Sequence, residues 1–423
     1  MHVIDRVVAE VDRATEEIVR FTSDLVRIPT VNPPGNEYEA CAHFLGAQLG
    51  RHGFDVEYIA AVGMPEHTAH HPRVNVVGIR RGSRPGPVIH LNGHIDVVPA
   101  GDGWTIHPFA GIVRDGRIFG RGVCDMKAGI AAAVFAAEAI ARAGVDVPGA
   151  IEISGTVDEE SGGFAGVAHL ARIGRIKKGR TDFVIIPEPL NVNRICVGHR
   201  GVYWFELTTH GRIGHGSMPF LGLSAIDGMA EVLAEIRQEL APTLASRVTA
   251  MPVVPEAARR ATINVNGIEG GQRVDGMQTP CVADLCRAVF DRRFLIEEGF
   301  AATKDEVTML IERALARIPG MKYELRDVMV VEPVQTPAGS PLIGALDGAI
   351  RRVLGSAAQL VASPGTFDQK HVVRIAGIED CVAYGPGELE QAHQPDESCA
   401  INDLVNATKV IALATLNLAG VRL

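Results

Sequence analysis

The first two hundred residues alternate between two hydrophobic patterns. Apolar residues recur at helical spacing over 5–26 and 37–50, and the alanine-rich segment 128–143 has the same period. Between these segments lie apolar runs of the length expected for buried strands, at 55–59, 75–78, 87–91, 150–157 and 183–186. Strands interleaved with helices predict an α/β fold with a mostly parallel sheet flanked by helices.

The pattern changes near residue 200. Residues 202–209 alternate between apolar and polar side chains like a half-exposed strand. The segments that follow predict an α+β sheet with helices on one face, built from helices at 224–240 and 303–318 and strands at 261–268 and 286–292. From about residue 332 the α/β rhythm returns and ends in a helix at 402–418. We therefore expect a large domain in two segments, 1–199 and 331–423, with a smaller domain, 200–330, inserted between them.

Composition narrows the class of protein. The chain has 423 residues, 47% of them hydrophobic, which is enough for two domains of ordinary size. Its formal net charge is −9 without a basic stripe, which argues against nucleic-acid binding. The longest apolar run, 130–140, is interrupted by Glu138 and is too short for a membrane span, and the charged residues within 1–22 exclude a signal peptide there. The seven cysteines form no CxxC pair and suit a reducing compartment. These features predict a cytoplasmic enzyme acting on a small molecule, with no nucleic-acid or membrane partner.

Two short segments are candidates for metal binding: one follows the predicted strand at 87–91, and the other precedes the predicted helix at 128–143. His94 and Asp96 follow the strand and project to the same face, and a carboxylate beside a metal-binding imidazole fixes the tautomer of that ring. Asp125 precedes the helix in a glycine-flanked loop, where the backbone can approach a ligand closely. A solvated turn at His94 and a helix N-cap at Asp125 are the ordinary alternatives.

Further acidic residues follow other predicted strands, and a histidine lies in a loop near the carboxyl terminus. The three consecutive acids 158–160 end the strand at 150–157 and repel one another unless a cation lies nearby. Glu188 lies between two prolines, and His393 lies in a loop near the carboxyl terminus. An exposed acidic loop, a polar turn and a surface histidine would each look similar.

Taken together, these residues carry more weight than each does alone. Two imidazoles and three carboxylates suit zinc, manganese or cobalt; they are His94, Asp125, Glu160, Glu188 and His393. Two such ions would activate a water molecule and polarise a carbonyl group. Glu159, adjacent to one of these residues, could take the proton from that water.

The chain resembles the dinuclear metallohydrolases that include acetylornithine deacetylase, succinyl-diaminopimelate desuccinylase, aminoacylase and glutamate carboxypeptidase. The resemblance spans nearly the whole chain, in family order, through GHIDVVPAGDGW (93–104), GRGVCDMKAGIAA (120–132), TVDEESGG (156–163), PEP (187–189), GHGSMP (214–219) and HQPDE (393–397). It implies two divalent ions, with zinc expected and manganese or cobalt as alternatives.

The resemblance also implies a role for each residue of the cluster. His94 and Glu188 would hold one ion, Glu160 and His393 the other, and Asp125 would bridge them. Asp96 would orient His94, and Glu159 would act as general base and later as proton donor. The peptide bond between Asp125 and Met126 is cis in this family.

For the inserted domain, the resemblance implies a dimerisation lid. His215 would reach the active site of the partner subunit in a homodimer and stabilise the oxyanion. Arg293, the Gly365–Thr366 loop and Arg200 would bind a substrate carboxylate. For Arg293, a plain ion pair with a neighbouring acid is the alternative.

One segment of the inserted domain departs from the family pattern. Relatives carry a short Asn-Val-Val-Pro or Asn-Val-Ile-Pro run after a Gly-Gly pair, whereas a longer, different segment occupies 272–283 of this chain, and the asparagine that faces substrate in relatives is missing. We expect hydrolysis of an amide in a small carboxylate such as an N-acyl amino acid. The alternatives are an unusual C–N bond (in a carbamoyl amino acid, a dipeptide, or an amino group on an activated aromatic carboxylate) and a non-catalytic, metal-stabilised binding protein.

Overall fold

The computed structural model describes residues 2–271 and 280–421. The predicted departure at 272–283 therefore lies largely outside the described residues. The chain forms two compact units. The first comprises Met1–Val197, Gln335–Val361 and Phe367–Leu423, and the second comprises Gly198–Val334 and Ala362–Thr366.

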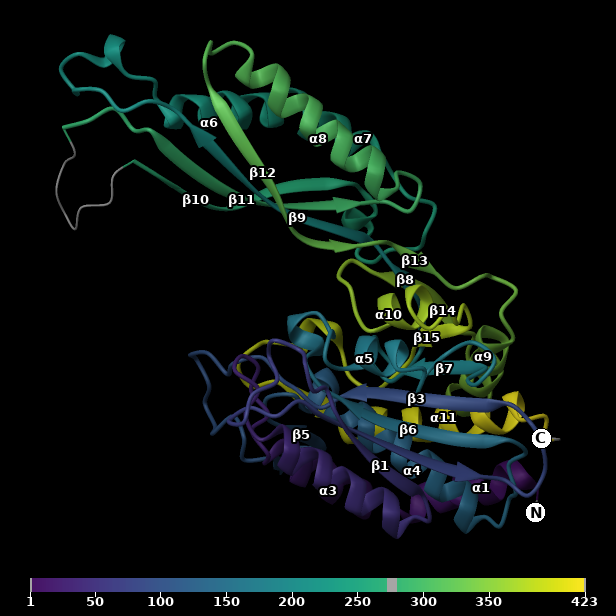
Figure 1. The fold of residues 1–423 in the computed structure, drawn as a ribbon. Helices are drawn as coiled ribbons and strands as arrows, with labels where there is room; N and C mark the ends of the chain where they lie inside the picture. The colour runs from purple at the N-terminus through teal and green to yellow at the C-terminus, as the bar shows by residue number, and fades with distance from the viewer. Residues whose placement is uncertain (1, 272–279, 422–423) are drawn as a thin grey trace. The chain divides into compact units, whose positions relative to one another are not determined.

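A large mixed sheet forms the centre of the first unit (Figure 1). Among the described residues its strand order is β1-β2-β6-β3-β7-β15-β8-β13, with β14 beside β8. The strands are β1 (Asp55–Ala60), β2 (Val74–Arg81), β3 (Val88–His94), β6 (Ala150–Thr156), β7 (Phe183–Ile186), β8 (Arg194–His199), β13 (Val334–Gln335), β14 (Gln359–Ser363) and β15 (Cys381–Ala383). The four central strands, β6, β3, β7 and β15, run parallel, which confirms the predicted parallel α/β core. Towards the edges, β1, β2 and β8 pair antiparallel.

Helices pack on this sheet through a shared apolar core. The helices of that core are α1 (Val3–Arg13), α2 (Thr15–Val26), α3 (Tyr38–Arg51), α4 (Ala128–Arg142), α9 (Pro341–Leu354) and α11 (Ile401–Leu418). The shorter α5 (Val167–Arg172) and α10 (Gln369–Arg374) contribute no residue to it. The alanine-rich α4 is buried over most of its length because small side chains let it approach its neighbours closely. At its first turn, a Cβ on Gly129 would lie 1.9 Å from the Pro187 carbonyl oxygen. Glycine therefore brings the start of α4 against the segment that carries Glu188.

The strand ends of the first unit bring distant segments to one edge. β3 and β6 are parallel neighbours with His94 opposite Thr156, and β7 follows on the other side of β3. The residues that follow each strand therefore emerge at the same edge, where open α/β sheets place their sites. A small sheet adds the carboxyl-terminal segment, because β16 (Ser398–Ala400) pairs with β5 (Arg117–Phe119), which pairs with β4 (Ile112–Arg114). This pairing brings the segment before β16 to the loop that precedes α4.

The second unit is a four-stranded antiparallel sheet in the order β10-β11-β9-β12. Its elements are β9 (Gly201–His210), α6 (Ala225–Glu235), α7 (Ala241–Ser246), β10 (Thr262–Gly270), β11 (Leu285–Phe294), α8 (Phe300–Leu315) and β12 (Lys322–Val331). Burial alternates along β9, whose inward side chains Tyr203, Phe205 and Leu207 join an apolar core with α6 and α8. Period-two burial of this kind leaves one face of a sheet for helices and the other for solvent.

None of the helices within the described residues has both the length and the apolar character that a membrane span requires.

Candidate metal centre

The predicted metal ligands of the first unit converge on one cluster. Nε2 of His94 lies 3.0 Å from Oδ1 of Asp125, and ligand atoms of His94, Asp125 and Glu160 all lie within 4.8 Å of one another. Nε2 of His393 lies 3.1 Å from Oε1 of Glu160 and 3.5 Å from Oδ2 of Asp125. Oε1 of Glu188 lies 3.9 Å from Nε2 of His94. Asp125 thus directs one carboxylate oxygen to each histidine.

Local backbone structure presents Asp125 to this cluster. It lies in a π-helical turn, Val123–Lys127, whose residues Asp125 and Met126 depart from helical dihedral angles. The peptide bond between these two residues is cis, as the family resemblance implies. A helix N-cap does not describe Asp125, because α4 begins three residues later at Ala128.

The electrostatics of the cluster suit a divalent cation. Burial, together with the charge of Asp125, raises the pKa of Glu160 to about 7 and also raises the pKa of Glu188. The hydrogen bond to Glu160 raises the pKa of His393 to about 9. Carboxylates crowded in a buried place repel one another, and a cation relieves that repulsion. The nitrogen and oxygen donors present here fit zinc, manganese or cobalt.

The three consecutive acids each have a different cationic neighbour. Asp158 points away from the cluster and accepts from Nε of Arg73 (3.0 Å) and from the Tyr38 hydroxyl (2.9 Å). Oε1 of Glu159 accepts from Nζ of Lys370 (2.9 Å). Glu160 faces His393. The repulsion expected within the run is thus offset residue by residue, and only Glu160 joins the cluster of predicted ligands.

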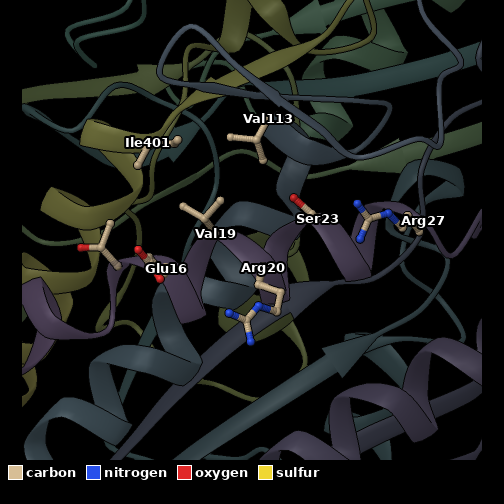
Figure 2. A pocket seen from close by; sticks show the side chains of 8 residues that line it. Glu16, Val19, Arg20, Ser23, Arg27, Val113 and Ile401 are labelled. Atoms are coloured by element: carbon tan, nitrogen blue, oxygen red, sulfur yellow. The ribbon is translucent and has the colours of Figure 1, made fainter.

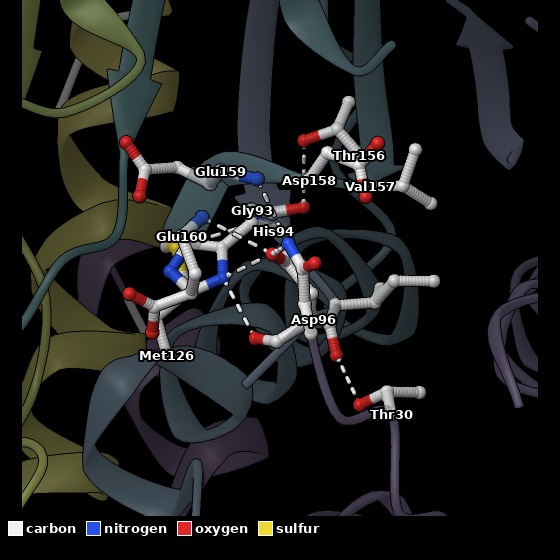
Figure 3. A network of polar contacts seen from close by, with 12 residues as sticks. Thr30, Gly93, His94, Asp96, Met126, Thr156, Val157, Asp158, Glu159 and Glu160 are labelled. Carbon is white, nitrogen blue, oxygen red and sulfur yellow. Dashed lines mark hydrogen bonds and ion pairs between the residues drawn. The ribbon is translucent and has the colours of Figure 1, made fainter. Parts of the chain in front are cut away.

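Asp96 contacts both His94 and the acidic loop, as Figure 3 shows. Nδ1 of His94 lies 2.9 Å from the main-chain oxygen of Asp96 and 3.5 Å from its carboxylate. The carboxylate accepts from the backbone N–H groups of Glu159 and Glu160, both at 3.1 Å, and from Asn32. Asp96 therefore ties the ring of His94 to the loop that carries Glu159 and Glu160.

Two residues that the sequence did not single out join the loops around Asp125 and His393. Arg121 and Glu397 form a buried ion pair of 2.5 Å. Oε1 of Glu397 accepts from the backbone N–H of Cys124 (2.8 Å) and of Asp125 (3.2 Å), and Arg121 donates to the His393 carbonyl (3.3 Å). Both lie inside motifs that carry the family resemblance, so the sequence marked their positions but did not indicate that they pair.

The other predicted site residues belong to the second unit. Arg293 donates to both carboxylate oxygens of Asp291, at 2.7 and 2.9 Å, which is the plain ion pair considered as its alternative. Arg200 is buried and donates to the carbonyls of Pro364 (3.1 Å) and Arg260 (2.9 Å). Burial and the charge of Arg293 lower the pKa of Arg200 to about 10.

The loops of the second unit hold its remaining predicted residues. His215 is exposed, and its Nδ1 lies 2.8 Å from the Ser217 hydroxyl. The backbone N–H of Gly365 donates to the Ser363 hydroxyl (3.1 Å), and Thr366 is half-buried.

A pocket elsewhere on the first unit has a different lining. Figure 2 shows it along α2, with Glu16, Arg20 and Arg27 among the side chains around it. It shares no residue with the cluster at His94.

Comparison with known proteins identifies the family. Residues 90–417 match the model of peptidase family M20/M25/M40. The succinyl-diaminopimelate desuccinylase of Burkholderia cenocepacia is 29% identical over 376 residues, which cover 86% of this chain and 91% of that protein. Among solved structures, the dipeptidase Dug1p of Saccharomyces cerevisiae has a TM-score of 0.77 at 16% identity and covers 99% of this chain and 98% of its own. Human carnosine dipeptidase 1 has a TM-score of 0.75 at 18% identity and covers 99% of both chains. The chain therefore belongs to peptidase family M20/M25/M40 and is a metal-dependent hydrolase of amide bonds.

Proposed function

We propose that this enzyme hydrolyses the amide bond of a small N-acyl amino acid or dipeptide that bears a carboxylate, using two divalent ions, with zinc expected. One observation carries the proposal: Asp125 directs Oδ1 towards His94 and Oδ2 towards His393. A carboxylate between two imidazoles suits a bridge between two ions. His94 and Glu188 would hold one ion, and Glu160 and His393 the other. Bound ions would lower the pKa of a water molecule and polarise the substrate carbonyl.

Glu159 performs the proton transfers in this mechanism. Its Oε1 is held by Lys370, whereas its Oε2 makes no hydrogen bond within the described residues. Oε2 takes a proton from the attacking water as the oxygen adds to the carbonyl carbon. The same proton passes to the amide nitrogen as the C–N bond breaks, so that a carboxylic acid and an amine leave. Asp96 supports these steps because it holds both the ring of His94 and the backbone of Glu159.

The second unit supplies substrate recognition in this proposal. Arg293, Arg200 and the Gly365–Thr366 loop would bind the substrate carboxylate, with Arg293 exchanging or sharing its partner Asp291. The guanidinium group suits this task because its planar donors match a carboxylate.

The inserted domain at 200–330 would also be the dimerisation lid of a cytoplasmic homodimer whose catalytic domain is formed by 1–199 and 331–423. His215 of the partner subunit would then stabilise the oxyanion. Exposed apolar side chains beside the His215 loop support an interface, with Phe220 76% and Leu221 54% exposed. Isolated apolar side chains are common on surfaces, but a group of them beside one loop favours a partner.

The family relatives support the substrate class, since one is named a desuccinylase and two structural neighbours are named dipeptidases. A second candidate is an unusual C–N bond, as in a carbamoyl amino acid or an amino group on an aromatic carboxylate. The unusual segment at 272–283 favours this candidate, because it replaces an asparagine that faces substrate in relatives.

An amine-release screen tests the proposal. The protein is reconstituted separately with zinc, manganese and cobalt and offered N-acetyl and N-succinyl amino acids, dipeptides, carbamoyl amino acids and aromatic amines bearing a carboxylate. Turnover of N-acyl amino acids or dipeptides is expected. Turnover of the unusual substrates alone would favour the second candidate. No turnover of any compound by protein with two bound ions would contradict both, and would indicate a metal-stabilised binding protein.

A further inference from the structure

Lys370 is a buried cation without an assigned task. It lies in α10 with a side chain only 5% exposed, and Nζ donates to Oε1 of Glu159 at 2.9 Å. This is the one hydrogen bond of its ammonium group within the described residues. Taking an ammonium ion out of water costs several kcal/mol unless a counter-charge lies close by. A hydrophobic side chain would fill the same space without that cost, so the charge itself needs an explanation.

The segment that carries Lys370 is held firmly in place. Before it, Oδ2 of Asp368 accepts from Nδ2 of Asn92 (3.0 Å), on β3. Nε2 of Gln369 donates to the Cys381 carbonyl (2.6 Å), on β15. After it, Nε2 of His371 lies 2.6 Å from the Gly162 carbonyl oxygen, in the loop that carries Glu159. The backbone on both sides of Lys370 is therefore anchored to the central sheet and to the acidic loop, which fixes the position from which its side chain extends.

The acidic loop is held on both sides of Glu159. Asp158 is bound by Arg73, and the backbone N–H groups of Glu159 and Glu160 are bound by Asp96. These contacts fix the main chain, but they leave the side-chain torsions of Glu159 free. Lys370 supplies the missing restraint, because it holds one carboxylate oxygen while the other has no hydrogen bond among the described residues.

The acidic side chains around Lys370 also favour a positive charge at this position. Burial, with the charge of Glu159, raises the pKa of Asp368 to about 7, and Glu188 is a further acid nearby. Without a cation at this place, the carboxylate of Glu159 would face like charges and would turn towards solvent.

We propose that Lys370 is the positioning residue of the catalytic base: it binds Oε1 of Glu159 so that Oε2 is presented to the attacking water. This inference rests on the proposed function, in which Glu159 is the base. Lys370 does not touch substrate or the reacting atoms; it acts through Glu159. The reaction rate falls about 10²-fold when a catalytic group is misplaced by about 1 Å. Removal of Lys370 should therefore lower mainly kcat.

The test compares Lys370→Met, Lys370→Arg and a matched control, Lys409→Met, in the zinc-reconstituted protein. Lys409 is also a mostly buried lysine paired with a carboxylate, that of Asp12, but it lies on α11 away from the cluster. For Lys370→Met, kcat should fall about 10- to 100-fold with little change in KM and with zinc content equal to that of the wild type. Lys370→Arg should recover most of kcat, and Lys409→Met should match the wild type. In a Glu159→Gln background, Lys370→Met should cause no further loss of the residual turnover.

Several results would overturn the inference. These are a kcat of Lys370→Met close to the wild-type value, an equal loss in the Glu159→Gln background, and a loss of bound zinc, since the last two indicate a general structural role. If Lys370→Met does not fold, Lys370→Ala replaces it, because it also removes the donor that holds Oε1 of Glu159; the same comparisons apply to it. A wild-type protein that hydrolyses none of the screened amides contradicts the proposed function itself, whereas an active wild type with an active Lys370→Met contradicts only the assignment of Lys370.

Discussion

The predicted residues of the two units differ in how they are held. In the first unit, the five predicted metal ligands lie in one cluster, and buried neighbours such as Arg121, Asp96 and Lys370 fix the loops that carry them. In the second unit, Arg293 is paired with Asp291 on its own strand and His215 lies on an exposed loop. The proposed metal ligands and base are held together within one unit, whereas the residues proposed for recognition are bound by other neighbours or face solvent. Changes in the first unit should therefore affect the chemical step, and changes in the second should affect substrate binding and assembly.

The largest expected effect is that of removing metal. Treatment with a chelator should abolish turnover, and zinc, manganese or cobalt should restore it, because water at neutral pH is a poor nucleophile without a cation to activate it. Full activity after complete metal removal, measured by elemental analysis, would contradict the assignment of the cluster.

Metal removal also has a predicted dependence on pH. The pKa values of Glu160 and His393 are raised to about 7 and about 9 in the metal-free fold, so both groups bind protons more tightly folded than unfolded. Their stabilising contribution is present at low pH and is lost as the pH rises through about 7 and then about 9. The Tm of the metal-free protein should therefore fall between pH about 6 and about 9, and zinc should reduce this slope. A metal-free Tm that rises over this range would contradict the geometry of the cluster.

Next in size is the loss of the proposed base. Glu159→Gln should lower kcat about 10²- to 10⁴-fold without loss of bound zinc, because Glu159 lies beside the ligands without belonging to them. Asp158→Asn is the control at the adjacent position. It weakens the ion pair with Arg73 and should lower the Tm while leaving kcat close to the wild-type value. Turnover retained in Glu159→Gln would remove Glu159 from the mechanism.

A smaller effect is expected in the second unit. Arg293→Met should raise KM for carboxylate-bearing substrates about 10- to 100-fold and change kcat less. Arg287→Met on the same strand is the control, since that arginine is half-exposed and pairs with Glu206 and Glu269. If the two variants behave alike, Arg293 serves only its ion pair with Asp291.

The smallest effect concerns assembly. Phe220→Ser should weaken the proposed dimer and lower turnover a few-fold at low protein concentration, because His215 of the partner subunit would then be missing from some active sites. Val113→Ser, which changes an exposed apolar residue of the first unit, is the control. Sedimentation at several concentrations would show the shift to monomer, and identical sedimentation of both variants and wild type would contradict an interface at Phe220.

The parallel core of the first unit and the five residues of the cluster were predictable from the amino-acid sequence. Apolar runs mark the strands, and because parallel strands end at one edge, His94, Glu160 and Glu188 are expected to meet there. Asp125 and His393 lie in loops instead, and they join the set because their residue types suit a metal ion. The resemblance then added a role to each of them.

The contacts that hold these residues in place depend on the folded chain. Lys370 and Glu159 are 211 positions apart, and Arg121 and Glu397 are 276 apart. No periodic pattern in the sequence predicts either pair. The partners of the three acids 158–160 are likewise chosen by which cation the folded chain brings to each, although all three look alike in the sequence. Buried ion pairs depend on distance and dielectric rather than on sequence spacing, and these quantities exist only after the chain has folded.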